Sequence, residues 1–178
     1  MTEPTDEGTE GATAEDVTPA PLLVHGLPAE EVRGQTVIHT DAARYKALFE
    51  ALRQEGYDLC SDLCAVDHLG NDTRVLPDGI AAERFEVVVN LRNLTQTSIV
   101  RVRCQVAADD PRVPTLFRLW PGTEAMEREA YDLLGIIFDE HPDLTRILLP
   151  DEWEGHPLRK DYAIGRVPVQ FKAAPATR

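Results

Sequence analysis

The sequence predicts a two-layer α+β domain, with helices on one face of an antiparallel or mixed sheet, and an extended C-terminal segment. Three observations support this fold class. Two neighbouring segments alternate apolar and polar residues, as strands with one buried face do. Three other stretches carry apolar residues at helical spacing. After His141-Pro142 the chain is too rich in Pro and Gly for long elements.

The 178-residue chain is expected to have three regions. Residues 1–21 contain six acids, no base and no apolar periodicity, which predicts a disordered acidic tail. Residues 22–138 are long enough for one domain with a sizeable core. Residues 139–178 are expected to form an extended segment and tail.

The first expected helix covers residues 41–55. Thr40 or Asp41 can cap its start, and Gly56 can end it in a left-handed conformation. Its apolar residues recur at positions i, i+3, i+4 and i+7 and would face the core. These residues are Tyr45, Leu48, Phe49 and Leu52.

Strands are expected at residues 57–66, 84–91 and 98–106. A polar loop joins the first two. The short link at 93–97 makes the last two an antiparallel hairpin with one buried face. The residues expected on that face are Phe85, Val87, Val89, Leu91, Val100, Val102, Cys104 and Val106.

A second helix is expected at residues 110–120, where Asp110 can cap the start and Pro111 fits the first turn. Its inward side chains would be Val113, Leu116, Phe117 and Trp120. A third helix is expected at 123–134 and ends at Gly135. Residues 136–138 then read as a short strand.

Charge and hydropathy exclude several classes of function. The formal net charge of −13 disfavours binding to phosphate backbones. No apolar run approaches the ~20 residues needed to cross a bilayer, and the N-terminus does not look like a secretory signal. We therefore expect a cytoplasmic chain that meets a membrane only through a partner.

The three cysteines, Cys60, Cys64 and Cys104, are expected to be reduced and buried. They are too few for a four-thiolate iron–sulfur cluster, and two of them lie too far apart along one strand for a shared metal. Glycine-rich nucleotide loops and hydrolase or metalloprotease motifs are absent. The sequence therefore predicts no cofactor or metal in this chain.

Glu127, Arg128 and Glu129 form the most suggestive polar cluster. Arg128 can pair with Glu124 one helical turn earlier. General acid–base catalysis would need a raised pKa and a nearby substrate, and the sequence offers neither. Solvated or interfacial ion pairs are therefore expected here.

His141 and His156 each precede a proline. Their separation does not match the tight spacing of metal ligands, so hydrogen-bonded turn histidines are expected. A proton-relay role within an assembly is the alternative.

The end of the chain carries candidate docking residues. Arg146 and Arg159 could each bind a carboxylate on an acidic partner in bidentate fashion. Aromatic residues often anchor interfaces, and Trp153 lies in a polar, Pro-flanked stretch. The full set expected at an interface is Glu127, Arg128, Glu129, His141, Arg146, Trp153, His156, Arg159, Lys160, Asp161, Tyr162 and Phe171.

Residues 127–162, which read EREAYDLLGIIFDEHPDLTRILLPDEWEGHPLRKDY, closely resemble the signature segment of the 30 kDa-subunit family of proton-translocating NADH-quinone oxidoreductase, respiratory complex I. The resemblance implies a cofactor-free structural subunit of the hydrophilic arm, beside the quinone-reducing module. FMN and iron–sulfur clusters would lie in partner subunits, which pass electrons from NADH to a quinone and couple this to proton translocation. The chain would then be peripheral, on the cytoplasmic side of the cell membrane, and inactive alone.

Two residues depart from the family pattern: Ala125 replaces a common tryptophan and Ala163 a common proline. Both suggest altered local packing. An equivalent subunit of a related membrane-bound hydrogenase, or of a dehydrogenase with another donor, is a second interpretation. A free-standing enzyme with Glu129 and His141 as acid and base is a third.

Overall fold

The computed structural model describes residues 22–163. The expected acidic tail at 1–21, and the end of the expected docking tail with Phe171, lie outside the described residues. In chain order the described elements are β1 (Leu22–Val24), β2 (Leu27–Val32), β3 (Gln35–Asp41), α1 (Ala42–Gln54), β4 (Leu59–Asp67), β5 (Phe85–Asn93), β6 (Ser98–Val106), β7 (Arg112–Pro114), the 3₁₀ helix η1 (Pro121–Thr123), α2 (Glu124–Leu134) and β8 (Ile137–Asp139).

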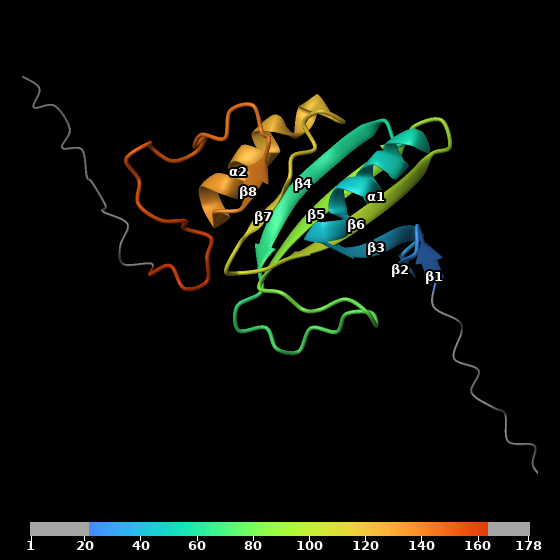
Figure 1. Cartoon of the computed structure of the whole chain (residues 1–178), viewed down its shortest axis with the longest axis horizontal. Coiled ribbons are helices and arrows are strands. Elements are labelled where there is room, and N and C mark those ends of the chain that lie inside the picture. The colour runs from blue at the N-terminus through green and yellow to red at the C-terminus, as the bar shows by residue number, and fades with distance from the viewer. Residues whose placement is uncertain (1–21, 164–178) are drawn as a thin grey trace, which may run out of the picture.

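Six strands form one mixed sheet in the order β1-β2-β3-β6-β5-β4 (Figure 1). All neighbours are antiparallel except β3 and β6, which run parallel. Strands β7 and β8 form a separate parallel pair. Helices α1 and α2 share one hydrophobic core with the sheet, so the α+β fold class is confirmed.

Two tight hairpins at the start of the described chain were not predicted. His25-Gly26 joins β1 to β2, and Arg33-Gly34 joins β2 to β3. All four residues have positive φ, between 52° and 76°. Two-residue turns of this hand match the twist of antiparallel strands, which explains why a glycine follows each non-glycine residue.

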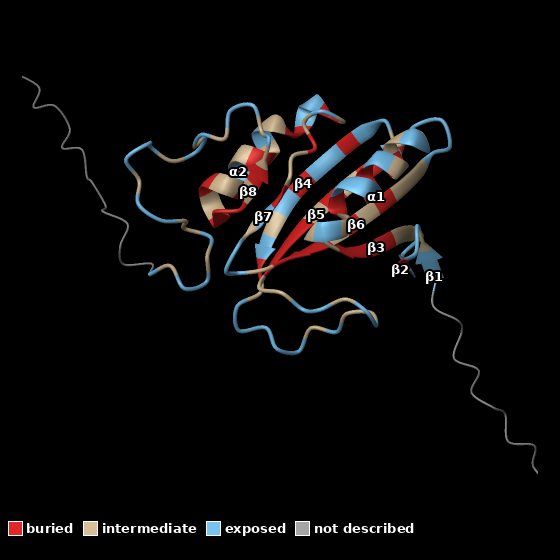
Figure 2. Cartoon of the chain, viewed as in Figure 1, coloured by how far each residue is buried: buried red, intermediate tan, exposed pale blue. Residues whose placement is uncertain are grey.

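Helix α1 follows the predicted pattern. The Asp41 carboxylate accepts the backbone N–H of Arg44 at 3.0 Å and so caps the first turn. The predicted apolar stripe is buried and faces the sheet (Figure 2). Gly56 has φ +89° just beyond the helix, as expected for a left-handed end.

The central strands β5 and β6 are also as expected. Every residue predicted for their inner face is at most 2% exposed. The register pairs Phe85 with Val106 and Leu91 with Val100, so the apolar residues of the two strands lie opposite one another. These strands form the middle of the core, and β4 closes that edge of the sheet.

The helix predicted at 110–120 is wrong. Residues 112–114 form β7, and the following residues make a turn closed by the N–H of Trp120 and the carbonyl of Leu116. Pro114 has no N–H and disfavours helical geometry at Val113, so a helix through this position would lose a hydrogen bond. Val113, Leu116 and Trp120 are nevertheless buried, which is why their spacing imitated a helix.

Helix α2 was predicted at almost its observed length. Pro121 begins the short 3₁₀ turn that leads into it, and Gly135 ends it with φ +73°. The helix lies beside β4 (Figure 1) and buries Ala130 and Leu134 in the core. It also buries two carboxylates, which are central to the site described below.

The prediction that all three cysteines are buried is wrong for Cys64. A register shift between Cys60 and Asp62 interrupts the alternation of β4. Cys60 is therefore buried on the core side, whereas Cys64 is exposed. Burial raises the pKa of Cys60 to about 11 and also raises the pKa of Cys64 and Cys104.

This bulge predicts selective alkylation. Iodoacetamide at mildly alkaline pH should modify Cys64 in the folded chain, because its sulfur is accessible, and should leave Cys60 and Cys104 intact. Peptide mass spectrometry reads out the result, and a denatured sample in which all three thiols react serves as control. Modification of Cys60 or Cys104 in the native chain would contradict the register of β4.

Candidate functional site

The segment that follows β8 crosses the outside of α2 without forming a helix or strand of its own up to residue 163 (Figure 1). It contains most of the residues expected to act at an interface. Its polar groups bind backbone and side chains at the C-terminal end of α2 and at the nearby ends of the sheet. Five clusters, described in turn, position these residues.

The first cluster surrounds Asp132, whose side chain is fully buried in the last turn of α2. One carboxylate oxygen accepts three consecutive backbone N–H groups, from Ile147, Leu148 and Leu149, at 2.8–3.1 Å. The other accepts Arg146 Nη1 at 2.6 Å. Burial alone would raise the pKa of Asp132, but these donors outweigh it, and the pKa is lowered.

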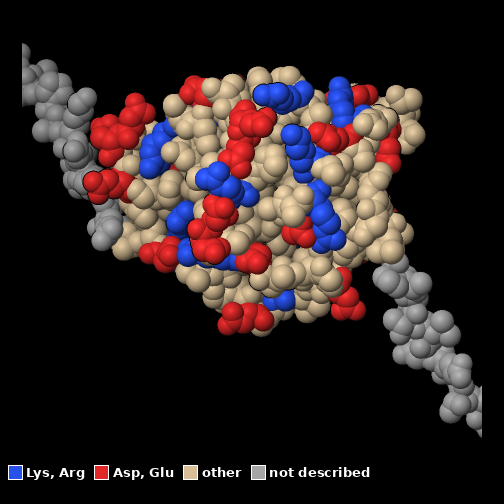
Figure 3. Space-filling view, in the orientation of Figure 1, with Lys and Arg blue, Asp and Glu red and all other residues tan. Residues whose placement is uncertain are grey.

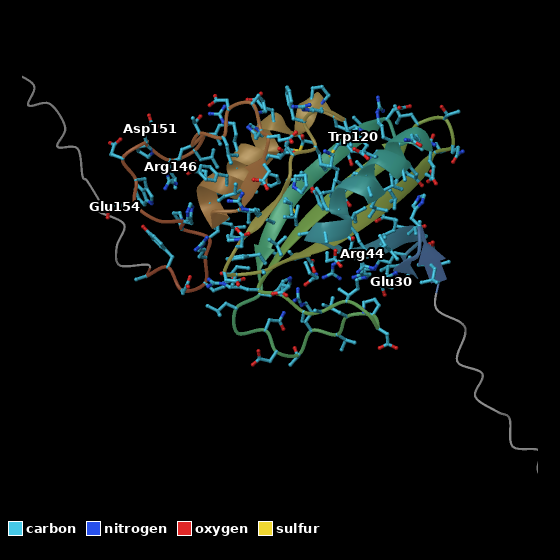
Figure 4. The ribbon with its side chains drawn as sticks, in the orientation of Figure 1. Glu30, Arg44, Trp120, Arg146, Asp151 and Glu154 are labelled. Carbon is cyan, nitrogen blue, oxygen red and sulfur yellow. The ribbon has the colours of Figure 1, made fainter. Side chains whose placement is uncertain are left out.

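Arg146 is committed to its own chain. Its guanidinium also donates to the backbone carbonyls of Asp132, Trp153 and Gly155, and only 14% of its side chain is exposed. The expectation that Arg146 binds a carboxylate of a partner is thus corrected, because the carboxylate that it binds is Asp132. Figure 4 shows Arg146 on the inner side of its loop.

The second cluster covers the end of α2. His156 Nδ1 donates to the carbonyl of Asp132 at 2.9 Å, and Arg159 Nε donates to that of Leu134 at 2.7 Å. Both side chains lie against Gly135, where a Cβ would come within 2.6 Å of each. Burial lowers the pKa of His156, which favours the neutral ring. His156 is therefore a hydrogen-bonded turn histidine, as predicted.

The third cluster joins the segment to the sheet through Arg84. Its guanidinium binds Asp67 at 2.8 Å and both carboxylate oxygens of Asp161 at 2.7 and 3.0 Å. Asp67 also accepts the backbone N–H of Lys160 at 2.8 Å. Arg159 lies over the ring of Phe85 at 5.2 Å from its centroid. Asp161 thus forms an internal ion pair, while the side chain of Lys160 stays exposed.

The fourth cluster is buried around Glu127, whose side chain is 0% exposed. It accepts the backbone N–H of Leu116 and the hydroxyls of Thr115 and Thr123. Burial raises the pKa of Glu127 despite these donors. The prediction of a solvated or interfacial ion pair at Glu127 is wrong, because the carboxylate links η1 and α2 to the turn after β7.

His141 lies beside this carboxylate, and its side chain is also 0% exposed. Its Nε2 is 3.2 Å from the carbonyl of Glu124, and its Nδ1 accepts the N–H of Asp143 at 3.1 Å. Both ring nitrogens therefore have backbone partners, as predicted for a turn histidine. Such a buried ring is poorly placed to exchange protons with a substrate, which argues against pairing Glu129 and His141 as acid and base.

The fifth cluster is the outer face of α2. Arg128 pairs with Glu124 at 3.4 Å, as predicted, and also donates to Thr145 and to the carbonyl of Arg146. Glu129 is exposed. Trp153 and Tyr162 are half-buried in the segment, and the ring of Tyr162 lies close to Gly155. Phe171 is outside the described residues.

Sequence reasoning missed Asp132, Asp67 and Arg84. A signal existed for Asp132: an acid in the last turn of a helix is unfavourable beside the negative end of the helix dipole, so it calls for a compensating group. No comparable signal marked Asp67 and Arg84. Their pairing depends on the sheet register and on a segment far along the chain.

Within residues 22–163, no group of three or more His, Cys, Asp or Glu side chains is arranged to hold a metal ion. Over the same residues, neither α-helix combines the length and apolar character needed to cross a bilayer.

The fold and these clusters define a small α+β domain whose C-terminal segment is fixed by buried charges. A family model described as "Respiratory-chain NADH dehydrogenase, 30 Kd subunit" matches residues 38–167. The chain belongs to this family.

Curated relatives agree with that assignment. The chain is 41% identical over 145 residues to the NADH-quinone oxidoreductase subunit designated C in Salinispora arenicola, covering 80% of this chain and 56% of the relative. It is 35% identical over 162 residues to the subunit of the same designation in Saccharopolyspora erythraea, covering 86% and 61%. The chain thus spans little more than half the length of these relatives.

Two solved structures have a similar fold. The trypsin-resistant fragment (1–134) of Nqo5 is 34% identical, with a TM-score of 0.58, covering 67% of this chain and 90% of that one. A chain of the membrane-bound sulfane sulfur reductase, an archaeal respiratory membrane complex, is 20% identical, with a TM-score of 0.62, covering 84% and 90%. The second similarity shows the fold alone.

The Asp67 cluster predicts a pH dependence of stability. Burial alone would raise the pKa of Asp67, but Arg84 and two backbone N–H groups lower it to about 2 from 3.8. The folded pKa is below the unfolded one, so the stabilisation is present above about pH 4 and is lost as pH falls towards 2. Asp67→Asn should cost about 2 kcal/mol at neutral pH, measured by urea unfolding.

The difference between wild type and Asp67→Asn should shrink as the pH falls through that window. Asp72→Asn, at an exposed acid in the loop between β4 and β5, is the control and should change little. A wild-type advantage that persists at pH 2 would contradict the assigned role of Asp67.

Contacts at the end of α2 predict a large effect of Gly135→Ala. Positive φ alone costs about 1 kcal/mol for alanine, and the clash with His156 and Arg159 should raise the total to about 3 kcal/mol. Gly34→Ala is the matched control, since φ is +76° and nothing lies within 4 Å of its added Cβ. Equal losses of unfolding free energy in the two variants would mean that the segment is not held against α2.

Proposed function

We propose that this chain is a cofactor-free structural subunit of the hydrophilic arm of an NADH-quinone oxidoreductase. The complex would transfer electrons from NADH through FMN and iron–sulfur centres to a quinone and couple this to proton translocation. FMN and the clusters would be bound by partner subunits. The chain would position partners that belong to the quinone-reducing module.

One observation carries this proposal. The ionisable groups most suggestive of chemistry, Glu127, Asp132 and His141, are buried and bonded to backbone groups of their own chain. Such groups stabilise a fixed surface and are inaccessible to a substrate. The identity to subunits of NADH-quinone oxidoreductase, up to 41% among those compared, supports the same role.

Several expected interface residues stay available to partners. Glu129 and Lys160 are exposed, and neither forms an ion pair within residues 22–163. Trp153 and Tyr162 are partly exposed in the same segment. Arg159 is partly exposed too, although its Nε is bonded to the end of α2. Contacts of these side chains with neighbouring subunits remain predictions.

The location that follows is peripheral, on the cytoplasmic side of the cell membrane, with attachment through the complex. A related hydrogenase, or a dehydrogenase with another electron donor, is the alternative assembly. The sulfane sulfur reductase comes from another such respiratory complex, but at 20% identity it supports the fold and not the assembly.

Affinity purification of the tagged full chain from membranes in mild detergent tests the proposal. We expect flavin and iron–sulfur subunits to co-purify in constant ratio, with NADH-quinone reductase activity. The chain purified alone should neither oxidise NADH nor contain flavin or iron. A hydrogenase large subunit in place of the flavin subunit would support the alternative, and turnover or tightly bound cofactor in the lone chain would disprove the structural role.

A further inference from the structure

The loop at residues 147–154, here called the docking loop, presents apolar side chains to solvent. Ile147 is 42% exposed and Leu148 is 60% exposed. Leu158, a few residues further along the same segment, is 53% exposed. Exposed aliphatic groups that follow one another in an ordered loop are typical of a surface that another molecule covers.

The fold holds these side chains outside at a cost. The N–H groups of Ile147, Leu148 and Leu149 all bind one oxygen of Asp132, so the backbone is fixed where the first two side chains cannot turn into the core. Arg146 fixes the other end of the loop through the carbonyls of Trp153 and Gly155. A loop fixed in advance loses little conformational entropy when it binds.

The charges beside the apolar pair are acidic. Asp151, Glu152 and Glu154 are exposed, and none forms an ion pair with another described residue. Asp151 and Glu154 lie on the outer side of the loop, opposite to Arg146 (Figure 4). Acidic side chains gather along this edge of the molecule in the space-filling view (Figure 3).

We propose that the docking loop inserts Ile147 and Leu148 into an apolar hollow of a partner subunit whose rim is basic. This inference rests on the proposed function, because it assumes that the chain works inside a multi-subunit complex. It reverses the expected sign of the contact: the base first expected to meet an acidic partner, Arg146, is committed internally, and the charges left free around the loop are carboxylates.

The occupant is a protein of another kind than this chain. The free carboxylates of the loop oppose approach to an anionic lipid surface. A second copy of this chain is disfavoured because its net charge of −13 adds like charge to like charge. A basic-rimmed hollow on a different subunit satisfies both the apolar pair and the acids.

Leu148→Ser in the tagged full chain tests the apolar half of the proposal. Leu94→Ser is the matched control, because Leu94 is 65% exposed at the turn between β5 and β6. Both purified variants should unfold at the wild-type temperature, since neither side chain is in the core. In detergent-solubilised membranes Leu148→Ser should recover about tenfold less partner protein than Leu94→Ser.

Equal recovery of partners with Leu148→Ser and Leu94→Ser would overturn the proposal. The wild-type chain separates this result from failure of the proposed function: if wild type also recovers no redox subunits, the assembly itself is wrong. If wild type assembles and both variants do too, only the docking loop is wrong.

Charge reversal tests the rim. Asp151→Lys with Glu154→Lys should reduce partner recovery about tenfold at low salt, and raised salt should narrow the gap to wild type. Asp72→Lys with Asp78→Lys, at exposed acids of the loop after β4, is the control and should assemble as wild type. Tighter assembly of the Asp151→Lys, Glu154→Lys variant would show an acidic rim and overturn the assignment.

Discussion

A carboxylate buried beside the negative end of a helix dipole determines how the second half of this chain is arranged. Asp132 occupies that position in α2, where neither burial nor the dipole favours its charge. The ionised form is stable only because Arg146 and three successive backbone N–H groups bind it. Since these donors come from the following segment, the helix end and the segment are stable only together.

The same logic continues along the chain. Arg146 binds the carbonyl of Gly155, which brings His156 and Arg159 onto the end of α2. Arg84 then joins the last described residues to the sheet. A stretch without helix or strand thus has an ordered path, because its polar backbone is satisfied by buried charges in place of a ladder. The surface that it presents is fixed by electrostatics as much as by apolar packing.

Regular periodicity accounts for the parts of the fold that the sequence predicted. The apolar alternation of β5 and β6 and the stripe of α1 report burial directly, so both were assigned correctly. The residues at 110–120 have the same spacing, but Pro114 and a turn place them in the core without a helix. The first three strands are short, and only the glycines at 26 and 34 mark their turns.

The site was predicted less well because charge type does not reveal burial. Glu127 and Arg146 look like surface residues in the sequence, yet their partners lie on segments that come together only in the folded chain. The histidines were easier, since a His-Pro turn offers backbone partners nearby. Ion pairs such as Asp67 with Arg84 depend on register and cannot be read from local spacing.

The parallel pairing of β3 with β6 constrains the order in which the domain can form during synthesis. Both N-terminal hairpins and the β5–β6 hairpin are local and can close as soon as their residues leave the ribosome. Thr36, however, finds its partner only when Val100 has been made. Until then β3 has one unpaired edge. The nascent chain must therefore keep two small sheets apart before they merge, and protection of that edge by a chaperone would be needed most in this interval.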